Sequence, residues 1–110
     1  MASPGEAVEI INAAVAATFT IPVAELHAPT RRRATVALAR QSAMYLAHVT
    51  FGLSFTEVGR AFGRDRTTAA HACRLIEDRR GKAGLDTTLA ELEHALCRNL
   101  HASASVGTAS

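Results

Sequence analysis

Apolar residues recur along this chain at the three- and four-residue intervals of amphipathic helices, and no segment alternates with the two-residue period of a strand. The first periodic segment predicts a helix from residue 4 to about residue 18 or 19, opened by a capping box over residues 3–6. A short helical turn is predicted over residues 22–26. A longer helix follows over residues 36–49 and ends before Gly52. The pattern therefore predicts an all-α fold.

The C-terminal part of the chain predicts one more helix, after Gly81 and Gly84 interrupt the periodicity. Asp86 is its predicted N-cap, and leucines at helical spacing give it one apolar stripe: Leu89, Leu92, Leu96 and Leu100. Residues 102–110 contain only Ala, Ser, Gly, Thr and Val, and we predict a flexible tail there. We therefore expect one domain over residues 1–101, small enough to bury only a modest core.

The middle of the chain predicts two helices joined by a tight turn. A capping box over residues 54–57 opens a helix over residues 55–62. Gly63 ends that helix, and Asp65 caps a second one over residues 66–80. Two helices joined by a turn of about three residues containing Gly are typical of the helix-turn-helix motif, whose second helix enters the major groove of DNA.

The second of these helices has a predicted inner and a predicted outer face. Helical spacing places four residues inside: Ala69, Ala72, Cys73 and Ile76. The outer flank holds five others: Arg66, Thr67, Ala70, His71 and Arg74. The residue types of its first turn suit a major groove, since Asp accepts from cytosine, Arg donates to guanine, and Thr contacts the thymine methyl group or a phosphate. The alternative is an ordinary capped helix start exposed to solvent.

Charge is concentrated in one part of the chain. The formal net charge is only +2, but residues 31–82 contain eleven of the twelve Lys and Arg residues and four of the ten acidic ones. That window therefore has a balance of +7, which leaves −5 elsewhere. Eleven of the twelve basic residues are Arg, whose planar guanidinium suits bidentate contacts to phosphate and guanine. Such a window is either a solvated face or a surface for nucleic acid.

The sharpest basic run is Arg31-Arg32-Arg33. It follows the loop signal of Pro29 and precedes the helix over residues 36–49. Three guanidinium groups at a junction between loop and helix are placed to reach a phosphate or a narrow minor groove.

Three blocks of sequence, in this order, resemble the C-terminal DNA-binding domain of the bacterial replication initiator DnaA. The blocks read ARQSAMYLA over residues 39–47, FTEVGRAF over residues 55–62 and GRDRTTAAHACRLIE over residues 63–77. The resemblance extends in weaker form to about residues 6–97. It implies a small helical domain with a Trp-repressor-like helix-turn-helix that binds double-stranded DNA.

The resemblance also implies roles for individual residues. It places Arg32 in the minor groove and gives Asp65 and Thr67 the reading of bases in the major groove. Three residues would hold phosphates: Arg40, Thr68 and His71. The same matched region supplies further candidates for contact with DNA: Arg33, Gln41, Thr56, Arg64, Arg66 and Arg74.

Three residues depart from the family's pattern. The family has His where this chain has Arg66, Val where it has Ala69, and Lys where it has Leu75. The position of Arg66 is one that reads bases in the family. We therefore expect the docking mode to be kept and the preferred DNA sequence to differ.

Other chemistry has weaker support. His94, Cys97 and His101 share one face of the last helix, but a metal site usually needs a fourth ligand from another element, and Cys73 is assigned to a core face. We therefore predict no metal and no cofactor. The sequence has no phosphate-binding loop, no nucleophile elbow and no evident pair of carboxylates, so we predict no enzyme.

Targeting signals are also absent from the sequence pattern. No apolar run has the length of a membrane span, and no basic residue precedes Arg31, as a signal peptide would require. We expect a cytoplasmic, nucleoid-associated protein in which Cys73 and Cys97 stay reduced.

Three functions remain open. Because the sequence shows no trace of the ATPase module of replication initiators, we favour a free-standing, sequence-specific regulator of transcription. The resemblance suggests an activator that works with RNA polymerase or a sigma-like partner, similar to the DNA-binding half of gene transfer agent activators. The alternative is a modulator of replication initiation that competes for origin boxes. A third hypothesis is a protein-interaction module that docks its partner on the leucine stripe of the last helix.

Overall fold

The computed structural model describes residues 4–22, 24, 26, 34–81 and 84–109. The described residues form helices and no strand, which confirms the all-α fold class. The helices are α1 (Pro4–Phe19), α3 (Ala34–Val49), α4 (Phe55–Phe62), α5 (Arg66–Arg79) and α6 (Leu85–Ala109). Ala24 and Leu26 also lie in helical backbone, within the short turn that the sequence predicts.

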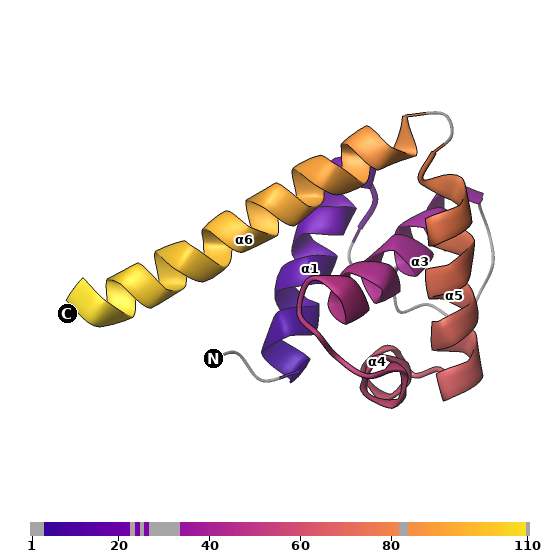
Figure 1. The fold of residues 1–110 in the computed structure, drawn as a ribbon, viewed down its shortest axis with the longest axis horizontal. Coiled ribbons are helices and arrows are strands. Elements are labelled where there is room, and N and C mark those ends of the chain that lie inside the picture. Colours follow the sequence, from indigo (N-terminus) through magenta and orange to yellow (C-terminus); the bar gives the residue numbers. More distant parts are fainter. Residues whose placement is uncertain (1–3, 23, 25, 27–33, 82–83, 110) are drawn as a thin grey trace.

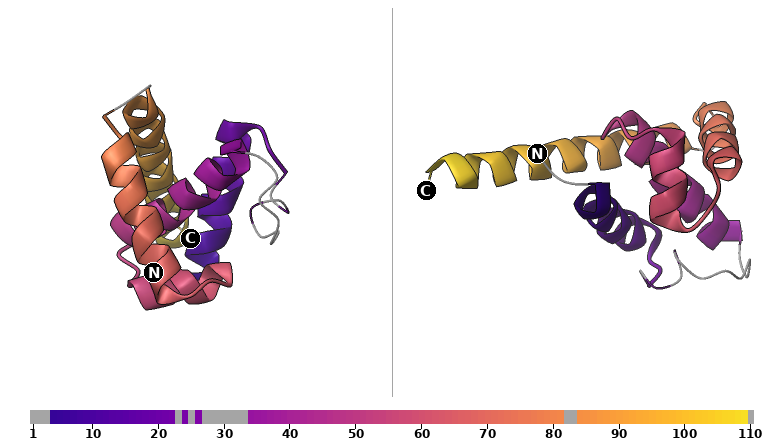
Figure 2. Two further views of the ribbon diagram at one scale, coloured as in Figure 1. Left: turned by 90° about the vertical axis from the view of Figure 1, so that its right-hand side faces the viewer. Right: turned by 90° about the horizontal axis from the view of Figure 1, so that it is seen from below.

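Helix α3 is the centre of the fold. It packs against α1 on one side and α5 on the other, and α4 closes the end of the bundle against α5 and α1 (Figure 1). Helix α6 crosses α1 and continues past it, which lengthens the molecule to 44 Å against 29 and 24 Å in the other directions (Figure 2). Helices α4 and α5 therefore pack on a base formed by α1 and α3.

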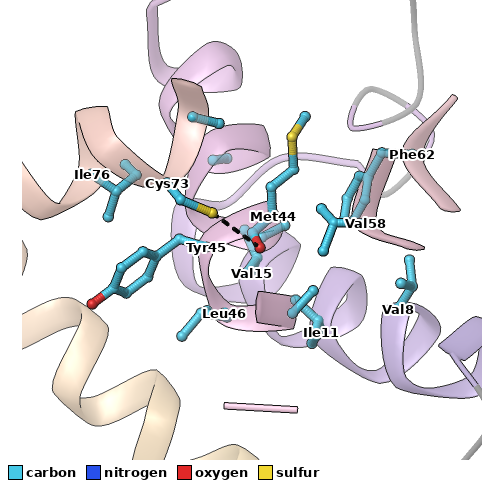
Figure 3. Close-up of a cluster of buried hydrophobic side chains, with 14 of the residues drawn as sticks. Val8, Ile11, Val15, Met44, Tyr45, Leu46, Val58, Phe62, Cys73 and Ile76 are labelled. Atoms are coloured by element: carbon cyan, nitrogen blue, oxygen red, sulfur yellow. Dashed lines mark hydrogen bonds between the residues drawn. The ribbon is translucent and has the colours of Figure 1, made fainter. Parts of the chain in front are cut away.

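The core is aliphatic, as a chain without Trp requires. Side chains from all the helices contribute to it, among them Ile11, Val15, Leu46, Val58 and Ile76 (Figure 3). The Cys73 thiol lies inside this cluster and donates a hydrogen bond of 3.9 Å to the Met44 carbonyl oxygen. Burial, followed by the charge of Glu77, raises the pKa of Cys73 to about 11, so its thiol stays protonated at neutral pH.

The turn after α3 follows the local signals of the sequence. Gly52 has a φ of 72°, its amide donates to the His48 carbonyl oxygen at 3.1 Å, and the Leu53 amide donates to Ala47 at 3.1 Å. His48 Nδ1 donates a 2.7 Å hydrogen bond to the Leu53 carbonyl oxygen, and the ring stacks on Phe55. These contacts define the turn that orients α4 relative to α3.

The start of α6 corrects one prediction. Asp86 is not the N-cap: the Gly84 carbonyl oxygen accepts the first helical hydrogen bond, from the Thr88 amide at 3.2 Å, and the helix begins at Leu85. A glycine at this place accommodates the φ of 74° that the turn requires. The Asp86 carboxylate is instead bonded to Arg80 at 2.7 Å.

The N-terminal capping box and the C-terminal tail were both predicted from residue types at the ends of the chain. The capping box at the start of α1 includes Ser3, which lies outside the described residues. At the other end, the backbone is helical to Ala109, whereas the sequence favoured a flexible tail from residue 102. Alanine and serine allow a helix to continue once α6 is formed. The division into a domain and a flexible tail stays a prediction.

Ser42 in the middle of α3 is expected to lower stability. Its side chain is fully buried, and its Oγ has no hydrogen-bond partner among the described residues. Ser42→Ala should therefore raise the free energy of unfolding by up to about 1 kcal/mol. A buried hydroxyl without a partner loses its hydrogen bonds to water on folding and gains none in the protein. Denaturant unfolding measures this change. Ser54→Ala is the control and should lower the stability, because the Ser54 Oγ caps α4. Unchanged or lower stability of Ser42→Ala would contradict the view that the Ser42 hydroxyl is destabilising.

Candidate nucleic-acid interface

The start of α4 has the capping box that the sequence predicts. The Glu57 amide donates to Ser54 Oγ at 3.1 Å, and the Ser54 amide donates to Glu57 Oε1 at 2.9 Å. The helix runs from Phe55 to Phe62, as predicted. Gly63 then adopts a left-handed φ of 67°, and its amide donates to the Arg60 carbonyl oxygen at 3.3 Å. The reversal of the chain between α4 and α5 is thus defined by local hydrogen bonds.

Gly59 allows this turn to fold back onto α4. The Arg64 amide donates a 2.7 Å hydrogen bond to the Gly59 carbonyl oxygen. A Cβ at residue 59 would lie 2.7 Å from the Arg64 carbonyl oxygen and 2.9 Å from that of Asp65, both backbone atoms. The sequence contains the one available signal, a glycine in the middle of a helical pattern, but this close approach was not predicted.

Asp65 is the N-cap of α5, as predicted. Its backbone is extended, and its Oδ1 accepts a hydrogen bond from the Thr68 amide at 2.7 Å. The backbone hydrogen bond from Thr68, then the one from its side chain, lowers the pKa of Asp65. The stabilisation by this cap is therefore present above the pKa of the unfolded chain and is lost as the pH falls through the lower pKa of the folded state.

Helix α5 has the two faces that its spacing predicts. The inner residues are all buried: Ala69, Ala72, Cys73 and Ile76. The polar residues of the predicted outer flank are exposed: Arg66, Thr67, His71 and Arg74. Thr68, which the spacing assigned to neither face, is exposed as well. Ala70 lies between these residues and is half-buried, and its small side chain adds little bulk to this face. The outer face of α5 therefore offers cationic and hydroxyl groups without large apolar side chains.

A hollow between α3 and α5 brings distant parts of the sequence together. The polar residues that line it are Arg40 and Gln41 from α3, Arg64 and Asp65 from the turn, and Thr67, Thr68 and His71 from α5. Seven of the twelve residues that the sequence proposes for DNA contact thus border one depression. Thr56 and Arg74 lie outside its lining, on the exposed surfaces of α4 and α5.

Arg40 differs from the other members of this group. Only 7% of it is exposed, and its Nε donates a 2.9 Å hydrogen bond to the Leu26 carbonyl oxygen. The side chain therefore fastens the chain before α3 to the core and reaches the hollow as well. The resemblance implied a contact to phosphate for Arg40 but not this second, structural role.

The other candidates are placed less centrally. Arg64 is half-buried, and its Nη1 donates to the Gly63 carbonyl oxygen at 3.4 Å. Arg32 and Arg33 lie outside the described residues, so their assignment to the minor groove remains a prediction.

The geometry agrees with the comparison to known proteins. Residues 8–76 match the family described as "Bacterial dnaA protein helix-turn-helix". The chain belongs to this DnaA family. It is 47% identical over 91 residues to the chromosomal replication initiator protein DnaA of Bordetella pertussis and to that of Bordetella petrii. The DnaA protein of Paraburkholderia phymatum is 45% identical over 91 residues.

The matched region is a small part of these relatives. It covers 81% of this chain but 19% of the Bordetella proteins and 17% of the Paraburkholderia protein. The chain thus spans about a fifth of the length of the DnaA proteins it matches. What the comparison shows for this DnaA-type domain is a helix-turn-helix of a DNA-binding family, which is not a catalytic one.

Arg80 was counted in the basic window but serves the fold of the DnaA-type domain. Its Nη1 and Nη2 donate to the Glu93 carboxylate at 3.1 and 3.2 Å, and its Nε donates to Asp86 at 2.7 Å. Nη1 also donates to the Tyr45 hydroxyl at 2.9 Å, and the guanidinium lies over the Tyr45 ring. The hydrogen bonds that Arg80 donates to Glu93, and next the one that it donates to Asp86, raise the pKa of Arg80. Its charge is therefore compensated and holds the end of α5 to α3 and α6.

The part of the chain that the structure describes holds neither a metal cluster nor a membrane-spanning helix. No group of three or more His, Cys, Asp or Glu side chains there is close enough to hold a metal ion. Within the same residues, no helix combines the length and the apolar character that crossing a bilayer demands.

Proposed function

We propose that this DnaA-type domain binds specific sites in double-stranded DNA and regulates transcription, as an activator that works with RNA polymerase or a sigma-like partner. The observation that carries the DNA-binding part is the hollow between α3 and α5. There, the buried Arg40 borders the exposed Thr68 and His71 beside the tip of a capped helix. Cationic and hydroxyl groups around a helix N-terminus are the groups that hold phosphates.

The arrangement supports one way of docking. The first turn of α5 would enter the major groove, with Asp65 and Thr67 toward the base edges. Arg40, Thr68 and His71 would hold the phosphates that flank this groove. The basic run that contains Arg32 would reach the adjacent minor groove, as the resemblance implies.

Regulation of transcription requires only that the domain occupy duplex DNA, where it recruits or blocks other proteins. Binding energy is enough for this, and no covalent chemistry is needed. Modulation of replication initiation is the second candidate. It is favoured by the similarity to proteins named chromosomal replication initiators, because a domain that keeps their docking mode would compete with them at origin boxes. Either function places the protein with the nucleoid in the cytoplasm.

Genome-wide occupancy separates these functions. A transcription regulator should occupy promoters whose transcripts change when the gene is deleted, whereas a replication modulator should occupy the origin. The control is His71→Ala, which removes an exposed group from the hollow and leaves the buried face of α5 unchanged. Its peaks should weaken. The absence of discrete peaks for the unchanged protein would contradict both candidates and favour a protein-interaction module.

A further inference from the structure

Arg66 occupies a position that helix stability disfavours. It is the first residue of α5, and no acidic residue lies in the first turn of that helix. The N-terminus of a helix carries a partial positive charge, which repels a guanidinium. A residue that disfavours the local helix indicates a functional role for its side chain.

The neighbouring Asp65 carboxylate forms no ion pair with Arg66. Asp65 directs its Oδ1 to the Thr68 amide at 2.7 Å. Among the described residues, no ion pair includes Arg66. The Arg66 side chain is exposed at the tip of α5 and is available to a partner outside the domain.

Arg66 lies outside the hollow at which the groups that would hold phosphates gather. Arg40, Thr68 and His71 line this hollow between α3 and α5, together with Asp65 and Thr67 at the helix tip, whereas Arg66 is absent from the lining. A recognition helix presents its N-terminal residues to base edges. An Arg in this place pairs through two donors with the O6 and N7 acceptors of guanine.

We propose that Arg66 determines part of the DNA specificity of this domain by reading one guanine in the major groove. This inference rests on the proposed binding of double-stranded DNA. The competing role is a contact from Arg66 to a phosphate, which would add affinity without preference for a base.

Selection of bound duplexes from a random library tests the inference. The unchanged protein should enrich sites with guanine at one position beneath the tip of α5. Arg66→Ala should lose the preference at that position and keep the others. Arg79→Ala is the matched control, since it removes an exposed Arg from the far end of the same helix.

Replacement of that guanine by 7-deazaguanine in the best site gives a direct readout, because it removes the N7 acceptor alone. Substitution of the guanine by another base should weaken binding of the unchanged protein by about 5- to 150-fold, with a smaller loss for 7-deazaguanine. Arg66→Ala should be insensitive to both changes. If the unchanged protein enriches no sequence, the proposed function fails. If it enriches a site and Arg66→Ala keeps every preference at lower affinity, only the guanine assignment fails.

Discussion

Gly59→Ala is expected to destabilise the helix-turn-helix by about 2 to 3 kcal/mol and to weaken DNA binding. The added Cβ would lie 2.7 Å from the Arg64 carbonyl oxygen and 2.9 Å from that of Asp65. Such overpacking typically costs about 1 to 3 kcal/mol, and here the opposing atoms are backbone, which cannot rotate away. The gain of about 1 kcal/mol from replacing a helical glycine by alanine is too small to offset a displaced turn.

Two other glycines serve as controls for this steric effect. At Gly63 a Cβ meets nothing within 4 Å, but the φ of 67° disfavours alanine, so Gly63→Ala should cost about 1 kcal/mol for conformation alone. At Gly81 a Cβ also meets open space, and Gly81→Ala should change stability by less than about 0.5 kcal/mol. Denaturant unfolding of the three variants gives the order. If Gly59→Ala is as stable as the unchanged protein or more stable, the backbone of the turn does not approach Gly59 closely enough to exclude a Cβ.

Arg40→Ala is expected to lower both the stability of the domain and its affinity for every duplex sequence. The loss of the Nε donor leaves the Leu26 carbonyl oxygen without that 2.9 Å hydrogen bond, which costs about 1 to 3 kcal/mol for a buried acceptor. If the guanidinium also holds one phosphate, its removal should make the slope of log K against log salt about one unit shallower.

Arg40→Lys separates the two roles of this residue. Lysine keeps the charge but has no Nε donor in the guanidinium geometry, so stability should fall while the salt slope stays close to that of the unchanged protein. Thermal unfolding and duplex titrations at several salt concentrations give both quantities. An unchanged salt slope in folded Arg40→Ala would assign Arg40 to the fold alone.

Much of the fold was predictable because its signals are local. The capping box at Ser54 and Glu57, the left-handed glycine at residue 63 and the cap at Asp65 each act within a few residues. They define α4 and the start of α5 from the sequence alone. The start of α6 was predicted wrongly because Asp86 suits an N-cap by residue type, and the sequence does not show the contact that engages it instead. Gly84 accepts the first helical hydrogen bond, and Asp86 pairs with Arg80.

The features that sequence reasoning missed depend on tertiary contacts. The network of Arg80 joins residues 45, 80, 86 and 93 from three helices, and no spacing in the sequence marks it. The burial of Arg40 likewise depends on Leu26, fourteen residues earlier in the chain. The candidate site residues were chosen largely by resemblance to the DnaA family. The structure brings seven of them to one hollow, and their contacts with DNA remain predictions.

Binding of duplex DNA by the whole chain, measured across a range of salt concentrations, tests the central claim most directly. If the basic window neutralises about five phosphates, log K should fall with log salt at a slope of about −4 to −5. At fixed salt, the best selected site should be bound at least about a thousandfold more tightly than a scrambled duplex. An affinity that does not depend on salt, or that is equal for the selected and scrambled duplexes, would contradict the assignment of the α3–α5 hollow and the tip of α5 as a sequence-specific DNA-binding surface.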